Sequence, residues 1–224
     1  MKKILSQIPE VGDRDLLESL DTKQISLVIR EAINSELPNL LGCRIDRKSK
    51  INIGPGGGHS GESWCHFNPK RNEFQWLLDI DSEVTFEEFR STLFHELIHV
   101  EQSARTVGSK SEAWLKKLKP QDKWYDIGAP PFGIGEAILS KKPDSYLEDP
   151  HEIEAFALEL ANQIKQSFDP MEIRAILTGL LEEPEALKAI LDTHFAKGQI
   201  QRFLKMVSSP SRRKFLKILY MDLT

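Results

Sequence analysis

The segment that follows Thr85 constrains the fold most. Residues 86–108 read FEEFRSTLFHELIHVEQSARTVG, a helical pattern that ends at a glycine. Thr85 and Glu88 stand at the spacing of a capping box, in which each side chain accepts a hydrogen bond from the other residue's backbone N–H. We therefore expect one long helix with the motif HELIH near its middle. The i to i+4 spacing places His95 and His99 on one face, one turn apart, so that they can share one metal ion.

An apolar stripe on this helix indicates which side packs against the core. Successive residues of an α-helix are rotated by about 100° around its axis, so His95 and His99 fall on the side opposite the stripe. Phe94 and Ile98 flank the histidines, so we expect their side to be a wall of a second contact or a cleft. A histidine pair packed in the core and a chance motif on a surface helix remain the alternatives. The stripe consists of Phe86, Phe89, Leu93, Leu97 and Val100.

Composition narrows the class of protein. A chain of 224 residues with 40% hydrophobic content can bury a sizeable core, as one domain or two packed lobes. Its formal net charge of −4 argues against nucleic acid as a partner. The apolar stretch near the start is broken by Ser6, Gln7 and Pro9, and no apolar run could span a bilayer, so we expect a cytoplasmic protein without membrane contact. Cys43 and Cys65 alone make no disulfide framework.

Patterns along the chain predict an α+β protein. Residues 13–41 are helical in pattern, and residues 44–81 read as two or three antiparallel strands. Residues 118–145 are rich in Pro and Gly, which fits an irregular connection bordering a cleft. From Asp149 onward, Asp-Pro and similar helix starts predict helices, including a basic amphipathic one at 211–223 whose exposed side could meet a protein partner.

We expect these elements to form one compact catalytic unit in two parts. Residues 1–108 would hold the N-terminal helices, the small sheet and the motif helix. Residues 109–224 would hold the cleft loop and a helical lobe that supplies a further ligand.

A third ligand is needed, because catalytic zinc takes three protein ligands and leaves a position for water. The segment YLEDPHEIEAFALELANQI carries Glu152 and Glu154 at the start of a helix. Asp149 and Glu152 also stand at capping-box spacing, and carboxylates there stabilise the helix dipole. The residues by themselves leave both interpretations open.

HELIH, followed by a downstream helix with a glutamate and then an alanine, resembles the gluzincin type of HExxH zinc metallopeptidases, of the zincin superfamily. The resemblance covers residues 73–165. It implies a zincin-like fold, with a small antiparallel sheet packed on the HExxH helix and a mostly helical C-terminal half. It also implies one Zn²⁺ per chain, held by His95, His99 and Glu152, with Glu154 as the alternative third ligand.

The implied activity is hydrolysis of peptide bonds in a peptide or protein, with Glu96 as general base on a zinc-bound water. Tyr146 is our first candidate for the group that stabilises the oxyanion, and the others are Tyr125, His151 and His59. Two other functions remain open. One is a zincin-fold binding protein with a structural or vestigial metal site, and the other is a zinc hydrolase of a non-peptide amide.

The chain departs from the family patterns at three positions. Gluzincins often carry an aspartate that supports a zinc-bound histidine, but Phe156 stands at that position. Gln102 and Arg105 stand where metzincins have a glycine and a third histidine, which sets that branch aside. Residues 73–81 are either the strand that lines the substrate cleft in zincins or an ordinary core strand.

Overall fold

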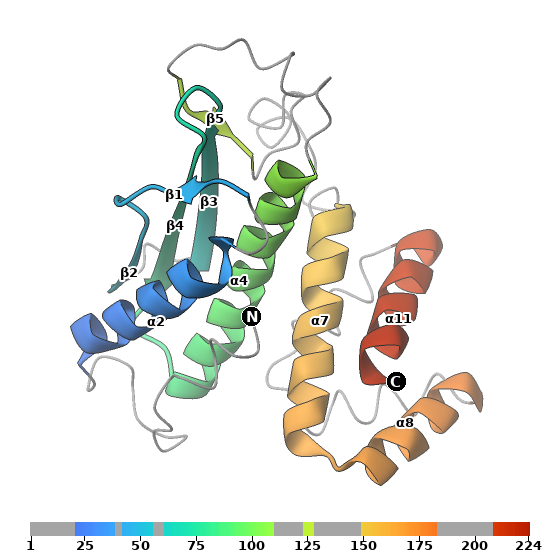
Figure 1. The fold of residues 1–224 in the computed structure, drawn as a ribbon. Coiled ribbons are helices and arrows are strands. Elements are labelled where there is room, and N and C mark those ends of the chain that lie inside the picture. The colour runs from blue at the N-terminus through green and yellow to red at the C-terminus, as the bar shows by residue number, and fades with distance from the viewer. Residues whose placement is uncertain (1–20, 39–41, 56–60, 110–122, 128–148, 183–207) are drawn as a thin grey trace. The chain divides into compact units, whose positions relative to one another are not determined.

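The computed structural model describes residues 21–38, 42–55, 61–109, 123–127, 149–182 and 208–224 (Figure 1). The chain divides into two compact units, Met1–Gly135 and Glu136–Thr224. Both ends of the helical segment predicted at 13–41, most of the predicted cleft connection, His59 and Tyr146 lie outside the described residues.

The first unit contains a mixed β-sheet. Among the described residues, this sheet has five strands. The order is β1-β4-β3-β5, and β2 also pairs with β4. β1 and β2 run parallel to β4, whereas β3 runs antiparallel to β4 and to β5. The strands are β1 (Arg44–Ile45), β2 (Lys50–Gly54), β3 (Gly61–Asn68), β4 (Glu73–Asp81) and β5 (Tyr125–Asp126).

The prediction of two or three antiparallel strands in residues 44–81 is therefore confirmed for β3 and β4 and wrong for β1 and β2, which are parallel to β4 and raise the number of strands there to four. Consecutive strands with short connections favour hairpins, and β3 and β4 do form one around the turn after Asn68. β1 and β2, however, skip β3 and pair with β4. Alternation along a strand tells which residues face the core, but not which strand lies beside it.

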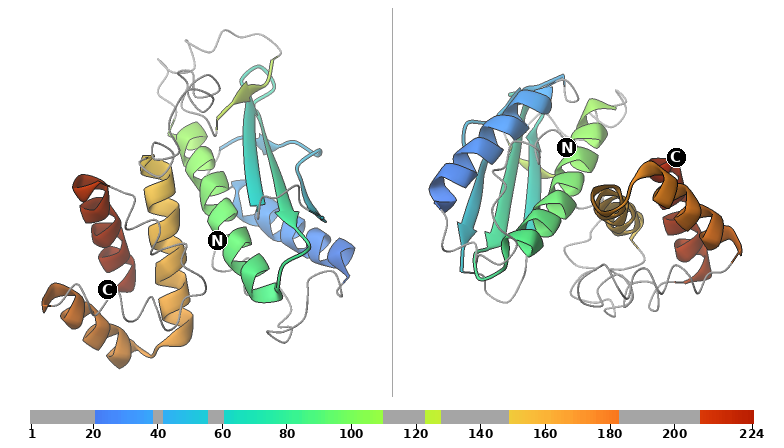
Figure 2. Two further views of the ribbon diagram at one scale, coloured as in Figure 1. Left: turned by 180° about the vertical axis from the view of Figure 1, so that it is seen from behind. Right: turned by 90° about the horizontal axis from the view of Figure 1, so that it is seen from below.

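Two helices cover the same face of this sheet: α2 (Thr22–Glu36) and α4 (Phe86–Gly108). Cys65 and Trp76 are register partners on β3 and β4, so their side chains lie on one face. The Trp76 indole N–H donates to Asn34 Oδ1 of α2 at 3.1 Å, and Cys65 hydrogen bonds with Ser103 of α4. Figures 1 and 2 show both helices on one side of the strands.

Helix α4 begins as the sequence predicts. Thr85 Oγ1 accepts from the Glu88 backbone N–H at 3.2 Å, and Glu88 Oε2 accepts from the Thr85 backbone N–H at 3.0 Å. This capping box satisfies the backbone donors that the first turn of a helix leaves unpaired. All five residues of the predicted apolar stripe are buried, which fixes the rotation of α4 on the sheet.

The second unit is helical in its described residues, with α7 (Pro150–Ser167), α8 (Pro170–Glu182) and α11 (Ser209–Leu223). Their apolar faces form one cluster that includes Ile153, Leu160, Phe215 and Leu219. Lys165 of α7 also binds α11, through an ion pair with Asp222 Oδ2 at 2.9 Å.

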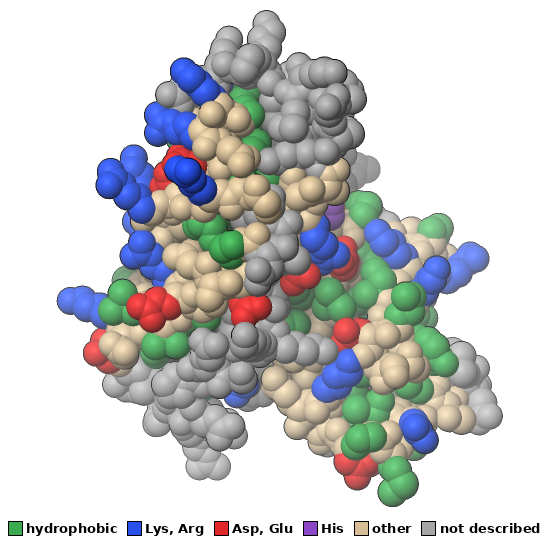
Figure 3. Space-filling view, viewed as in Figure 1, with side chains coloured by type: hydrophobic (Ala, Val, Ile, Leu, Met, Phe, Trp, Pro, Cys, Tyr) green, Lys and Arg blue, Asp and Glu red, His purple; other side chains and the backbone are tan. Residues whose placement is uncertain are grey.

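The predicted amphipathic helix near the end of the chain is α11, with its apolar side buried and its basic side exposed. Figure 3 shows basic side chains over its N-terminal part. A partner for this surface stays a prediction. No helix among the described residues is long and apolar enough to cross a membrane.

Candidate metal centre

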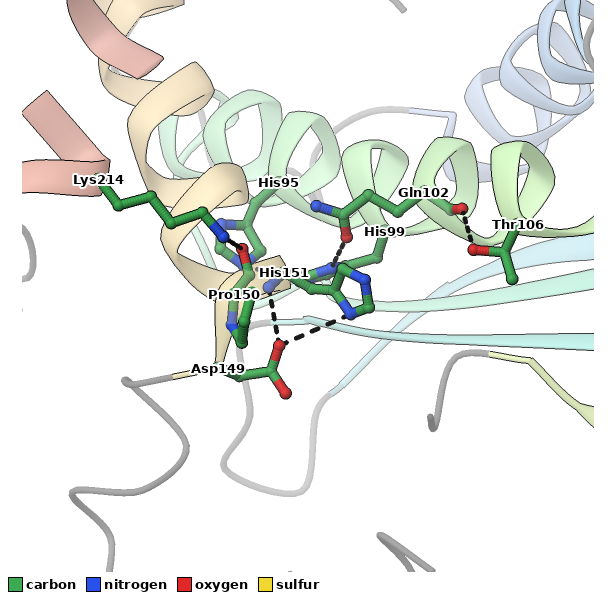
Figure 4. A network of polar contacts seen from close by, with 8 residues as sticks. All are labelled: His95, His99, Gln102, Thr106, Asp149, Pro150, His151 and Lys214. Atoms are coloured by element: carbon green, nitrogen blue, oxygen red, sulfur yellow. Dashed lines mark hydrogen bonds and ion pairs between the residues drawn. The ribbon is translucent and has the colours of Figure 1, made fainter. Parts of the chain in front are cut away.

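The histidine pair of α4 has its ring nitrogens turned toward each other. Nε2 of His95 and Nε2 of His99 are 3.2 Å apart, and the ring planes meet at 76° (Figure 4). His95 is buried and His99 is half-buried. The side of α4 opposite the apolar stripe is therefore covered, as Phe94 and Ile98 indicated.

This separation suits two ligands of one metal ion. A tetrahedral zinc ion with nitrogen ligands at about 2.0–2.1 Å holds those nitrogens roughly 3.3 Å apart. Two neutral imidazoles whose lone pairs face each other at 3.2 Å repel unless a cation or a proton lies between them. The donor set thus fits a metal ion without rearrangement of α4.

Gln102, one turn after His99, holds the other side of the His99 ring. Its Oε1 lies 2.9 Å from His99 Nδ1, and the Gln102 side chain is buried (Figure 4). In the sequence, Gln102 stands out only as a departure from metzincins. The signal that identifies its contact is the i to i+3 spacing from His99 on a helix.

Glu96 is buried where α4 meets the start of β3. A Cβ atom at Gly61 would lie 3.3 Å from Glu96 Cγ and only 2.4 Å from Thr92 Cγ2. The absence of a side chain at Gly61 therefore lets the strand backbone approach this part of the helix. Glu96 follows His95 directly, so its carboxylate leaves the helix about 100° away from that ligand.

Cys65 lies in the same contact between β3 and α4. Burial raises the pKa of its thiol to about 12, and the negative charges of Asp126 and Glu96 add to this, while a hydrogen bond with Ser103 opposes it. The thiol is therefore neutral, and it is a poor nucleophile or metal ligand.

Glu152 lies in the first turn of α7 and is buried. Asp149 caps this helix by accepting from the His151 backbone N–H at 2.7 Å (Figure 4). Pro150 occupies the first helical position, as the Asp-Pro pair predicted. A buried carboxylate needs a partner of opposite charge, and a metal ion is one.

One ligand atom from each of His95, His99 and Glu152 lies within 4.8 Å of the others. Among the described residues, these three form the group that could hold a metal ion, and Glu154 is not part of it. Two imidazole nitrogens and one carboxylate oxygen are donors that zinc commonly takes.

The predicted oxyanion stabilisers are distributed differently. Tyr146 and His59 lie outside the described residues. Tyr125 is half-buried in β5, and Lys123 Nζ lies 5.9 Å from the centre of its ring. His151 is exposed on α7, with Nδ1 3.6 Å from Asp149 Oδ1. A catalytic role for any of them stays a prediction.

Residues 73–81 form a core strand and not a rim. β4 pairs with β1 and β2 along one edge and with β3 along the other, so its backbone groups are used within the sheet. On β3, by contrast, β5 pairs only at His66 and Phe67. Among the described residues, no strand pairs with the β5 edge of β3 from Gly61 to Trp64. This end of β3 lies close to Glu96.

Comparison with models of protein families, with curated proteins and with solved structures finds no match to this chain.

Proposed function

We propose that this protein is a zinc-dependent metallopeptidase of the gluzincin type. The observation that carries the proposal is the group of His95, His99 and Glu152 with a buried Glu96 next to the first histidine. A purely structural zinc site has no use for a carboxylate at that position. The assignment of Glu152 and not Glu154 as third ligand is part of the proposal.

Zinc suits this donor set best. Zinc accepts imidazole nitrogens together with a carboxylate oxygen, whereas magnesium and calcium take oxygen ligands. Three protein ligands leave one position for water or substrate. Zinc bound there supplies a Lewis acid that lowers the pKa of a water molecule and polarises a carbonyl group.

In this reaction Glu96 moves the proton. Its carboxylate accepts a proton from the attacking water and then donates it to the amide nitrogen that leaves. Burial of Glu96 keeps bulk water from competing for that proton and holds the side chain in one place.

The edge of β3 from Gly61 to Trp64, with which no described strand pairs, supports a peptide as substrate. Backbone N–H and C=O groups of Gly61–Trp64 can pair with an extended chain in the manner of an added strand. Gly61 lies beside Glu96, so a peptide paired at this end of β3 would run close to the proposed base. We therefore propose that β3, and not β4, binds the substrate backbone.

The substitution Glu96→Gln tests the proposal. We expect the variant to keep its zinc and to hydrolyse a casein or fluorogenic peptide substrate roughly 10²- to 10⁴-fold more slowly, because the amide cannot accept the proton. Glu101→Gln, on the same helix, removes the charge of a half-buried side chain that pairs with the exposed Arg105, and it should leave the rate unchanged. If the Glu96→Gln variant turned over substrate at the wild-type rate, Glu96 would not be the general base. Activity on simple amides but on no peptide would identify a non-peptide amidohydrolase instead.

A further inference from the structure

We propose that Gln102 is a positioning residue, whose side-chain carbonyl fixes the tautomer of His99 and turns its Nε2 lone pair toward the metal position. The inference rests on the proposed metal site. Gln102 then fulfils the role for which gluzincins use an aspartate, at a different place in the chain.

The contact between the two side chains determines the tautomer. An amide oxygen only accepts hydrogen bonds, so with Oε1 of Gln102 at 2.9 Å the Nδ1 of His99 must carry the proton. A neutral imidazole has one N–H, and its Nε2 therefore presents a lone pair. That nitrogen lies 3.2 Å from Nε2 of His95, as two ligands of one ion require.

The position of Gln102 keeps this contact in place. Gln102 is 7% exposed, so water competes weakly for Nδ1. The i to i+3 spacing on α4 places both side chains on one face of the same rigid element. A short hydrogen bond from Thr106 Oγ1 to the Gln102 backbone carbonyl, 3.0 Å, adds a further contact at this turn.

The residue at the usual buttress position is unsuited to the role. Phe156 has no hydrogen-bonding side-chain atom, and its ring packs against the apolar cluster of the second unit. Gln102 differs from an aspartate in carrying no charge. It orients the ring without adding a third buried acid to Glu96 and Glu152.

Ring-nitrogen NMR of the metal-free protein tests the tautomer without any need for activity or zinc. At a pH where free histidine is neutral, we expect His99 as the Nδ1–H tautomer in the wild type and in Gln102→Glu. In Gln102→Leu, which has no acceptor, we expect the Nε2–H form to gain population. An Nε2–H tautomer of His99 in the wild type would overturn the proposal.

Zinc affinity, measured by competition with a chelator, provides the second readout. Removing such a support commonly costs roughly 10- to 100-fold in metal affinity. We expect a loss of that size in Gln102→Leu and its recovery in Gln102→Glu, where the acceptor returns. Gln163→Leu is the control, since Gln163 lies on α7 and bonds Glu159 at 3.4 Å. Unchanged affinity in Gln102→Leu would also overturn the role.

These outcomes separate this proposal from the peptidase assignment. If the protein cleaves no peptide, the tautomer of His99 and its dependence on Gln102 can still be measured. If Gln102→Leu fails to fold, the wild type and Gln102→Glu still decide the tautomer. If zinc binds and Glu96 is the base but His99 carries its proton on Nε2 in the metal-free protein, only the role of Gln102 fails.

Discussion

Cys65 and Glu96 are two acids in one buried contact, and the structure gives them different environments. The thiol of Cys65 is fully covered between β3 and α4, and the charge of Glu96 acts on it. Burial thus keeps the thiol neutral and makes Cys65 part of the packing between β3 and α4.

The raised pKa of Cys65 predicts a loss of stability at alkaline pH. Below about pH 9 the thiol is protonated in the folded and in the unfolded chain. Between about 9 and about 12 the unfolded chain releases this proton and the folded chain keeps it, so the free energy of unfolding falls as pH rises. The slope for one proton is at most about 1.4 kcal/mol per pH unit.

Urea unfolding of the wild type and of Cys65→Ala, measured from pH 8 to pH 10.5, isolates this contribution. Lysines and tyrosines titrate in the same range, so the difference between the two proteins is the quantity of interest. We expect the stability of the variant, although lower at pH 8, to fall less steeply above pH 9. If the free energy of unfolding fell with pH at the same slope in both proteins, Cys65 would ionise normally in the folded protein.

At this scale the sequence predicted the histidine pair, because motif spacing and helix periodicity are local properties. Glu152 was predicted through the resemblance to gluzincins, with Glu154 as the alternative. Gln102 was missed, although it lies only three residues from His99. A glutamine on a helix usually faces solvent. Phe94 and Ile98 indicated that this side of α4 is covered, but no motif marks Gln102 as the partner of His99. Its partner became visible only through the 2.9 Å contact.

Among the elements, α4 was predictable and the sheet was not. The capping box, the apolar stripe and the ending near Gly108 are all present in the structure. Four of the five described strands lie in the predicted region and β3 pairs antiparallel with β4 as predicted, but the pairing of β1 and β2 was wrong. Parallel pairing of β2 with β4 depends on contacts between distant segments, and β4 consequently occupies the middle of the sheet and not its rim.

The contact between β3 and α4 predicts a cost for a side chain at Gly61. In Gly61→Ala the new Cβ would lie 2.4 Å from Thr92 Cγ2, which is closer than such atoms can pack. We expect a loss of about 1–3 kcal/mol in the free energy of unfolding, as overpacking usually causes. Chemical denaturation of the variant measures this loss.

Two further variants check the cause. Gly54→Ala adds a methyl group where nothing lies within 4 Å, so its stability should change much less. Thr92→Ser removes Cγ2, and the double variant Gly61→Ala with Thr92→Ser should recover most of the lost stability. No recovery would mean that the contact with Thr92 is not the source of the cost.

Across the whole molecule, the candidate ligands come from distant parts of the sequence. His95 and His99 lie on a helix that the sheet fixes from one side, and Glu152 begins a helix held by the apolar cluster with α11. We therefore expect metal affinity to depend on Glu152 as well as on the HELIH segment. A metal bound only to the native chain would also stabilise it.

The zinc content of the purified protein tests the central claim most directly. We predict one zinc ion per chain in the wild type and in Glu154→Ala after loading and removal of loosely bound metal. The double variant His95→Ala with His99→Ala should hold none, and Glu152→Ala should lose most of its zinc on dialysis. A wild type that retains no zinc, or a double variant that retains as much as the wild type, would contradict the account.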